Sequence, residues 1–292
     1  MGKEQQVGCN PLELLSRVSS EEFSRVCDSV VDYQISPQLL ANTVTAIQDG
    51  RIVALVTTHQ SYFEIETQRR FCQELNQISS EPIETFLTYS APAVGSNINK
   101  LFELRRPVYD QCHLNMLGII RSEDRSHIKY KENITPEMEK DHWENAKTLA
   151  KALKLGGCLV IVPLEASLNS GRRVNLETDQ INGIQATDTD EGLTRMIAKN
   201  ALLIPCGIDG GYKVIDPKHH LPTEKFINSF VISPREKLVT FKANKLIDPF
   251  QDYQDKKIPS NCYRKICHQI IMEVANNVSP SARGAYQQFC RN

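Results

Sequence analysis

The sequence predicts an α/β fold: a mixed, largely parallel sheet flanked by helices, with a small N-terminal helical region. From residue 51 onward, short continuous apolar runs alternate with longer segments of helical periodicity. Such runs are typical of strands buried on both faces, and their alternation with helices indicates a layered sheet. The first fifty residues show helical patterns only. A length of 292 residues is compatible with one large domain or two smaller units.

Three short helices are expected in the N-terminal region. Each begins at a side chain that can cap a helix, and these capping residues are Asn10, Ser20 and Ser36. Proline follows the first and the last of them at the first helical position, and Gly50 ends the third helix. We therefore expect an N-terminal helical region over residues 1–48 and an α/β domain over residues 49–292.

Strands and helices alternate over the rest of the chain. The expected strands are apolar runs at residues 52–56, 86–89, 118–120, 158–162 and 201–204. The expected helices carry apolar residues at helical spacing and lie at residues 63–75, 135–154, 191–199 and 260–278. Two further runs, residues 226–232 and 238–241, are expected to add antiparallel strands.

Composition and charge argue against several classes of function. The chain carries 34 Lys and Arg against 35 Asp and Glu, so it lacks the basic excess of a general nucleic-acid surface. No apolar run reaches the roughly 18–20 residues of a membrane-spanning helix, and the N-terminus lacks a signal core. Nine scattered cysteines without a C-x-x-C pattern indicate a reducing compartment. We expect a cytoplasmic protein.

The segment that follows the first expected strand contains the most informative residues for chemistry. The strand delivers His59 to its C-terminal end, where open α/β sheets place their ligands, and Glu64 follows five residues later. The two side chains can meet only if His59 lies in the turn before a helix and Glu64 in its first turn. Ser61 is a suitable N-cap for that helix. An imidazole oriented by a carboxylate can take a proton from an alcohol.

A purely structural interpretation of the same residues stays open. Ser61 and Glu64 match a capping box, in which the glutamate carboxylate accepts a hydrogen bond from the serine amide. His59 would then be only a polar residue at the end of a strand. The spacing alone does not decide between this interpretation and catalysis.

The run His59-Gln60-Ser61-Tyr62-Phe63-Glu64 resembles the first motif of the glycerolipid acyltransferases. This superfamily includes the glycerol-3-phosphate and lysophosphatidate acyltransferases, and its first motif is a histidine followed, after four residues, by an aspartate. The chain departs from that motif in two places. Thr58 replaces the common asparagine, and Glu64 replaces the aspartate and so adds a methylene within the pair.

Three further segments follow in the order of that family. Residues 117–121 resemble the second motif, a short apolar strand that ends in an arginine. Residues 162–167 are similar to the third motif, although alanine replaces its glycine, and an arginine-containing turn at residues 170–173 follows. Residues 203–207 resemble the fourth motif, an apolar strand with a proline near its end.

The resemblance implies an enzyme of phospholipid biosynthesis. It implies transfer of a fatty acyl group from an acyl carrier protein or CoA thioester to a hydroxyl of glycerol 3-phosphate. His59 would be the general base and Glu64 would orient it, with no metal and no cofactor beyond the acyl thioester. The residues implied in acceptor binding are Arg121, Arg172 and Arg173 for the phosphate, with Glu165 and Ser167 shaping the pocket.

Two alternatives stay open at this point. The acceptor could already carry one chain, which would make the protein a 1-acylglycerol-3-phosphate acyltransferase. The chain could also be a non-catalytic descendant that binds lipid or a partner protein, in view of its departures at Thr58, Glu64, Ala166 and Leu168. Peripheral membrane contact is expected of an enzyme whose products are membrane lipids, and no nucleic-acid partner is expected.

Overall fold

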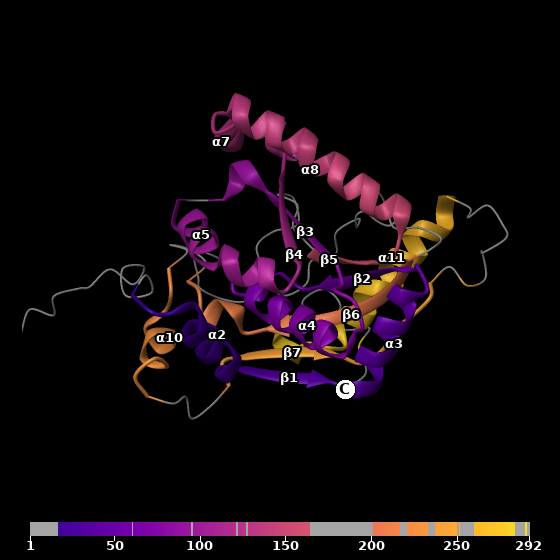
Figure 1. The fold of residues 1–292 in the computed structure, drawn as a ribbon, viewed down its shortest axis with the longest axis horizontal. Coiled ribbons are helices and arrows are strands. Elements are labelled where there is room, and N and C mark those ends of the chain that lie inside the picture. The colour runs from indigo at the N-terminus through magenta and orange to yellow at the C-terminus, as the bar shows by residue number, and fades with distance from the viewer. Residues whose placement is uncertain are drawn as a thin grey trace, which may run out of the picture.

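The structure is a computed structural model. It describes residues 17–59, 61–94, 96–120, 122–126, 128–163, 201–216, 221–232, 237–249, 251, 260–283 and 290. In this part of the chain the elements form three layers, with a sheet in the middle and helices on both of its faces (Figure 1).

The described strands form one seven-stranded sheet in the order β1-β7-β6-β2-β5-β3-β4. The strands are β1 (Val31–Ile35), β2 (Ile52–Thr57), β3 (Thr85–Ser90), β4 (Leu114–Ile119), β5 (Cys158–Pro163), β6 (Ala201–Asp209) and β7 (Val239–Ala243). All neighbouring strands run parallel except β6 and β7, which are antiparallel. The prediction of a mixed, largely parallel sheet flanked by helices is confirmed.

Helices cover both faces of this sheet and bury two separate hydrophobic clusters. One face carries α2 (Ser20–Ser29), α3 (Pro37–Gln48), α4 (Glu64–Ile78), α5 (Ser96–Gln111) and α10 (Glu224–Asn228). The other face carries α8 (Pro136–Leu155) and α11 (Ser260–Ala275). The remaining short elements are α6 (Ser122–Ser126), α7 (Ile128–Lys131), η1 (Ala91–Ala93), η3 (Gly211–Lys213) and η5 (Pro280–Ala282).

The central strand β2 shows why the apolar runs form strands. All six of its residues are buried, and they divide between the two clusters in alternation. Val53 and Leu55 belong to one cluster, whereas Ala54 and Val56 belong to the other. Because successive side chains of a strand point to opposite faces, a strand between two helical layers must be apolar throughout.

The N-terminal region differs from the expectation of helices alone. Helix α2 is capped by Ser19 and not, as the sequence predicts, by Ser20, because the Ser19 hydroxyl oxygen accepts a hydrogen bond from the amide of Glu22 at 3.1 Å. After α2 the chain forms β1, which pairs in parallel with β7. The helix expected near Asn10 lies outside the described residues. The division of the chain at residue 48 stays a prediction.

Most of the other predicted elements are present, with a few differences. Strand β7 confirms the expected antiparallel addition. Residues 226–232 form no strand, because α10, which the Thr223 hydroxyl caps, extends to Asn228. Helix α5 was not expected from the sequence. The helix expected at residues 191–199 lies outside the described part of the chain. Among the described helices, none combines the length and the apolar character needed to cross a membrane.

Candidate active site

His59 and Glu64 meet at the carboxyl end of β2. His59 lies two residues beyond the strand, and Glu64 is the first residue of α4. Nδ1 of His59 is 2.7 Å from Oε2 of Glu64. The glutamate side chain is only 2% exposed, whereas the imidazole is 34% exposed. The structure therefore has the arrangement that this spacing requires, with His59 in the turn before the helix and Glu64 in its first turn.

The second carboxylate oxygen of Glu64 also has a partner. Oε1 accepts a hydrogen bond from the backbone amide of Ser61 at 3.0 Å. The glutamate thus makes the capping-box contact with one oxygen and the imidazole contact with the other. The structural and the catalytic interpretations of this sequence do not exclude each other, because one buried carboxylate serves both contacts.

Ser61 is not the N-cap of α4, contrary to expectation. The helix begins at Glu64 and has Phe63 in the capping position. The Ser61 hydroxyl oxygen instead accepts from the amide of Phe63 at 3.2 Å. Backbone hydrogen bonds of the i→i−3 type, such as that from the amide of Glu66 to the carbonyl of Phe63, form the start of this helix. The serine therefore stabilises the turn that precedes the helix.

Thr58 fixes this turn to the neighbouring strand. Its hydroxyl donates to the carbonyl of Ile208 at 2.5 Å and accepts from the amide of the same residue at 2.7 Å. Thr58 is fully buried, so both of these bonds are shielded from water. The residue that departs from the acyltransferase pattern therefore anchors the start of the His59 turn to β6.

Gly211 packs directly against the same turn. A Cβ atom at this position would lie 2.7 Å from the Ser61 hydroxyl oxygen and 3.4 Å from Oε1 of Glu64. The first distance is shorter than real Cβ contacts allow. The absence of a side chain at Gly211 is therefore what permits the turn to lie where it does.

Replacing Gly211 by alanine is expected to lower the free energy of unfolding by about 1 kcal/mol. The Ser61 hydroxyl must rotate away from the new methyl group and lose its bond with the Phe63 amide. Urea unfolding measures the effect. In a Ser61→Ala background the same substitution should be less destabilising, and an equal loss in both backgrounds would contradict this explanation.

A pocket of about 100 Å³ adjoins the His59–Glu64 pair. Its walls come from the carboxyl ends of β3 and β5, from the turn after β2 and from the first turns of α4. The apolar part of the lining is formed by Ile65, Leu87, Ala93, Val94 and Pro163. Because a cavity volume of about 10–15 Å³ is enough to hold one water molecule, the described pocket has room for several water-sized groups.

Aromatic rings extend from the imidazole along this region. Tyr62 packs edge-on against His59, with ring centroids 6.0 Å apart. Phe102 of α5 contacts Tyr62 in the same manner, and Tyr89 of β3 contacts Phe102. Burial raises the pKa of the Tyr89 phenol, which therefore stays neutral in the physiological range. The dyad thus adjoins apolar and neutral groups.

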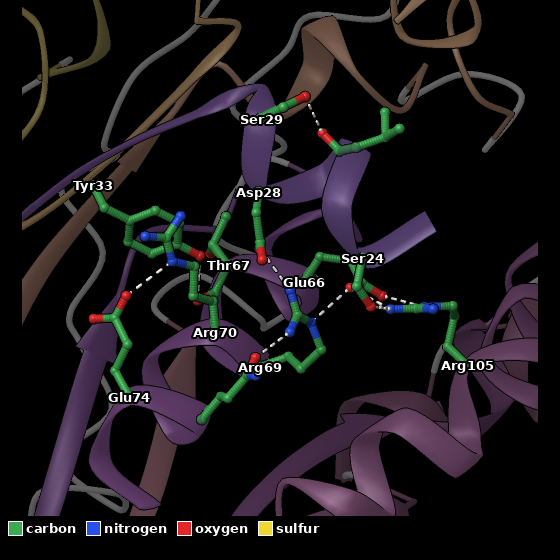
Figure 2. A network of polar contacts seen from close by, with 12 residues as sticks. Ser24, Asp28, Ser29, Tyr33, Glu66, Thr67, Arg69, Arg70, Glu74 and Arg105 are labelled. Atoms are coloured by element: carbon green, nitrogen blue, oxygen red, sulfur yellow. Dashed lines mark hydrogen bonds and ion pairs between the residues drawn. The ribbon is translucent and has the colours of Figure 1, made fainter. Parts of the chain in front are cut away.

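Helix α4 also carries a buried ionic network that sequence reasoning missed (Figure 2). The Glu66 carboxylate accepts from Arg105 of α5 at 2.8 and 3.0 Å and from Arg69 at 3.1 Å. Tyr109 donates to the same carboxylate at 2.9 Å, and Arg69 reaches Asp28 of α2 at 2.7 Å. The network links α2, α4 and α5.

The carboxylates and guanidinium groups of this network are neutralised by direct contact with one another rather than by solvent. Burial alone would raise the pKa of Glu66, but the guanidinium groups of Arg105 and Arg69 and the Tyr109 hydroxyl together hold it below its ordinary value. Burial raises the pKa of Asp28, whose hydrogen bond with Arg69 does not offset the loss of solvation.

The sequence indicates only part of this network. The i,i+3 spacing of Glu66 and Arg69 predicts an ion pair, but no local pattern predicts that Arg105 joins it.

The other predicted site residues lie outside the described part of the chain. These are Arg121, Glu165, Ser167, Arg172 and Arg173. Their roles stay predictions. Among the described residues, no group of three or more His, Cys, Asp or Glu side chains is placed to hold a metal ion.

Two comparisons with known proteins bear on the resemblance. No protein-family model matches the chain, and no curated protein matches it in sequence. The resemblance to the glycerolipid acyltransferases therefore rests on the four motif-like segments.

Proposed function

We propose that the protein is an acyltransferase that moves a fatty acyl group from an acyl carrier protein or CoA thioester to a hydroxyl of glycerol 3-phosphate. One observation carries the proposal. The partly exposed imidazole of His59 contacts the buried carboxylate of Glu64 beside a pocket at the carboxyl end of the sheet. This is the arrangement that a general base for an alcohol requires.

In the proposed reaction His59 acts as the general base. Its Nδ1–H donates to Glu64, which leaves Nε2 to accept the proton of the acceptor hydroxyl. The alcohol oxygen attacks the thioester carbonyl carbon as that proton moves to Nε2. The tetrahedral intermediate then collapses, the carbon–sulfur bond breaks, and the imidazolium returns the proton to the leaving thiolate. No acyl-enzyme forms.

Glu64 is a positioning residue in this mechanism. Its carboxylate holds the ring in one tautomer and stabilises the imidazolium that forms during the reaction. The Ser61 amide fixes the other carboxylate oxygen, so the carboxylate cannot rotate freely. The methylene that glutamate adds relative to aspartate does not separate the pair, since the two atoms lie 2.7 Å apart.

The remaining parts of the proposal come from the resemblance. Arg121, with Arg172 or Arg173, would bind the acceptor phosphate, because guanidinium groups match phosphate oxygens in geometry and charge. Glu165 and Ser167 would shape the acceptor pocket. The enzyme would work in the cytoplasm, in phospholipid biosynthesis, and would contact the membrane peripherally when it releases its lipid product.

Incubation of the purified full chain with acyl-CoA or acyl carrier protein thioesters and glycerol 3-phosphate tests the proposal. We expect an acylglycerol phosphate and one equivalent of free thiol. Mass spectrometry should identify the ester, because the nine cysteines of the chain react with thiol reagents. A reaction without the acceptor measures simple hydrolysis. Failure to form any ester from either donor would overturn the proposal.

A further inference from the structure

A buried amide oxygen at the pocket has no hydrogen-bond partner among the described residues. It is Oε1 of Gln68, whose residue is only 1% exposed. Gln68 lines the same pocket as His59 and Glu64. It lies one helical turn after Glu64 on α4, so the two side chains share a face of the helix. Buried polar atoms are almost always paired, so this unpaired oxygen of a pocket-lining residue is a candidate ligand contact.

The orientation of the amide is set by the strand beneath it. Nε2 of Gln68 donates to the hydroxyl oxygen of Thr57 at 3.2 Å, and Thr57 is the fully buried last residue of β2. The amide nitrogen is therefore engaged, and Oε1 is the atom left to contact a ligand. An amide oxygen can only accept a hydrogen bond, so the ligand group that faces it must be a donor.

The pocket thus offers two hydrogen-bond acceptors from neighbouring residues. In the tautomer that the proposed mechanism uses, the ring nitrogen of His59 that faces away from Glu64 is one, and Oε1 of Gln68 is the other. Both oxygens of Glu64 already have partners in His59 and Ser61. A small molecule with two free hydroxyl groups on adjacent carbons can supply one donor to each of these acceptors.

We infer that Gln68 determines acceptor specificity by accepting a hydrogen bond from the second free hydroxyl of a diol acceptor. The inference rests on the proposed function and narrows its substrate class. One hydroxyl of glycerol 3-phosphate gives its proton to His59, and the other donates to Oε1 of Gln68. An acceptor whose second oxygen is already esterified has no donor for Gln68.

The test compares two ligands and two forms of the full chain. The ligands are glycerol 3-phosphate and 3-hydroxypropyl phosphate, which lacks only the second hydroxyl. The proteins are the wild type and Gln68→Met, whose side chain is of similar length but has no strong acceptor. Equilibrium dialysis measures binding, and mass spectrometry measures ester formation in the same preparations. Thermal unfolding checks that the variant is folded.

We expect the wild type to bind glycerol 3-phosphate about tenfold more tightly than the deoxy analogue. In Gln68→Met this ratio should fall to about one. The wild-type comparison needs no variant, so equal affinities in the wild type overturn the inference even if Gln68→Met does not fold. Equal affinities in the wild type, no binding of either ligand, or a ratio that survives in a folded Gln68→Met would each overturn the inference.

Ligand binding and ester formation test the role of Gln68 and the acyltransferase proposal separately. Ester formation without discrimination between the two acceptors leaves the acyltransferase proposal intact and overturns the role of Gln68. Discrimination in binding that Gln68→Met abolishes, without any ester formation, supports the role of Gln68 and contradicts the acyltransferase proposal.

Discussion

Replacing His59 by alanine is expected to lower the rate of acyl transfer to glycerol 3-phosphate by about 10²–10⁴-fold. The variant retains the pocket but has no group to take the proton of the acceptor hydroxyl. The fold should survive, because the imidazole is partly exposed and its removal leaves Glu64 bonded to the Ser61 amide. Steady-state ester formation measures the rate, and circular dichroism checks the fold.

Removing the carboxylate of Glu64 is expected to lower the rate of acyl transfer nearly as much. In Glu64→Gln the amide no longer stabilises the imidazolium, and an amide nitrogen facing Nδ1 favours the wrong ring tautomer. We expect a loss of about 10²-fold or more. Glu74→Gln is the matched control, since it makes the same change on the same helix at a residue paired with Arg70. Activity within a few-fold of the wild type in His59→Ala and Glu64→Gln would contradict the mechanism.

Removing the carboxylate of Glu66 is expected to produce the largest loss of stability. Glu66→Gln should lower the free energy of unfolding by about 3–5 kcal/mol, because it leaves buried positive charge without compensation. The side chains of Arg69 and Arg105 are only 2% and 3% exposed. Urea unfolding measures the effect. Glu74→Gln is again the control, since its pair with Arg70 is partly exposed and should contribute about 0–1 kcal/mol.

The effect of Glu66 should depend on pH with a definite sign. Its pKa is lower in the folded protein than its ordinary value of 4.5, so the unfolded chain takes up this proton first as the pH falls. The stabilisation is fully present above that ordinary value and is lost as the pH falls through the folded pKa. The difference in stability between wild type and Glu66→Gln should therefore narrow on acidification. A difference that stays constant or widens would contradict the ionic origin of the effect.

The layered sheet could be predicted because its strands are buried on both faces. Residues 52–56 of β2 include no polar position, and a strand between two helical layers needs such a run. Strand β1 could not be predicted in the same way. Val30 and Val31 fit the helical spacing of the preceding segment, and what makes residues 31–35 a strand is pairing with β7 more than 200 residues later.

The candidate site was predictable only where its partners are close in sequence. The five-residue spacing of His59 and Glu64 restricts them to the turn-and-helix arrangement that the structure has. The supporting contacts come from distant segments: Thr58 bonds to Ile208, and Gly211 packs on Ser61. Gln68 resembles any polar helix residue in the sequence. Its importance depends on burial at the pocket, which only the assembled sheet creates.

Glycerol 3-phosphate labelled with ¹⁸O in its free hydroxyl groups provides the most direct test of a hydroxyl activated by His59. After a single turnover with an acyl thioester, the mechanism predicts that the wild type forms an ester whose bridging oxygen carries the label. His59→Ala should form almost none of it. An unlabelled ester oxygen would contradict attack by the acceptor hydroxyl, and equal amounts of labelled ester from both proteins would contradict the assignment of His59 as the base.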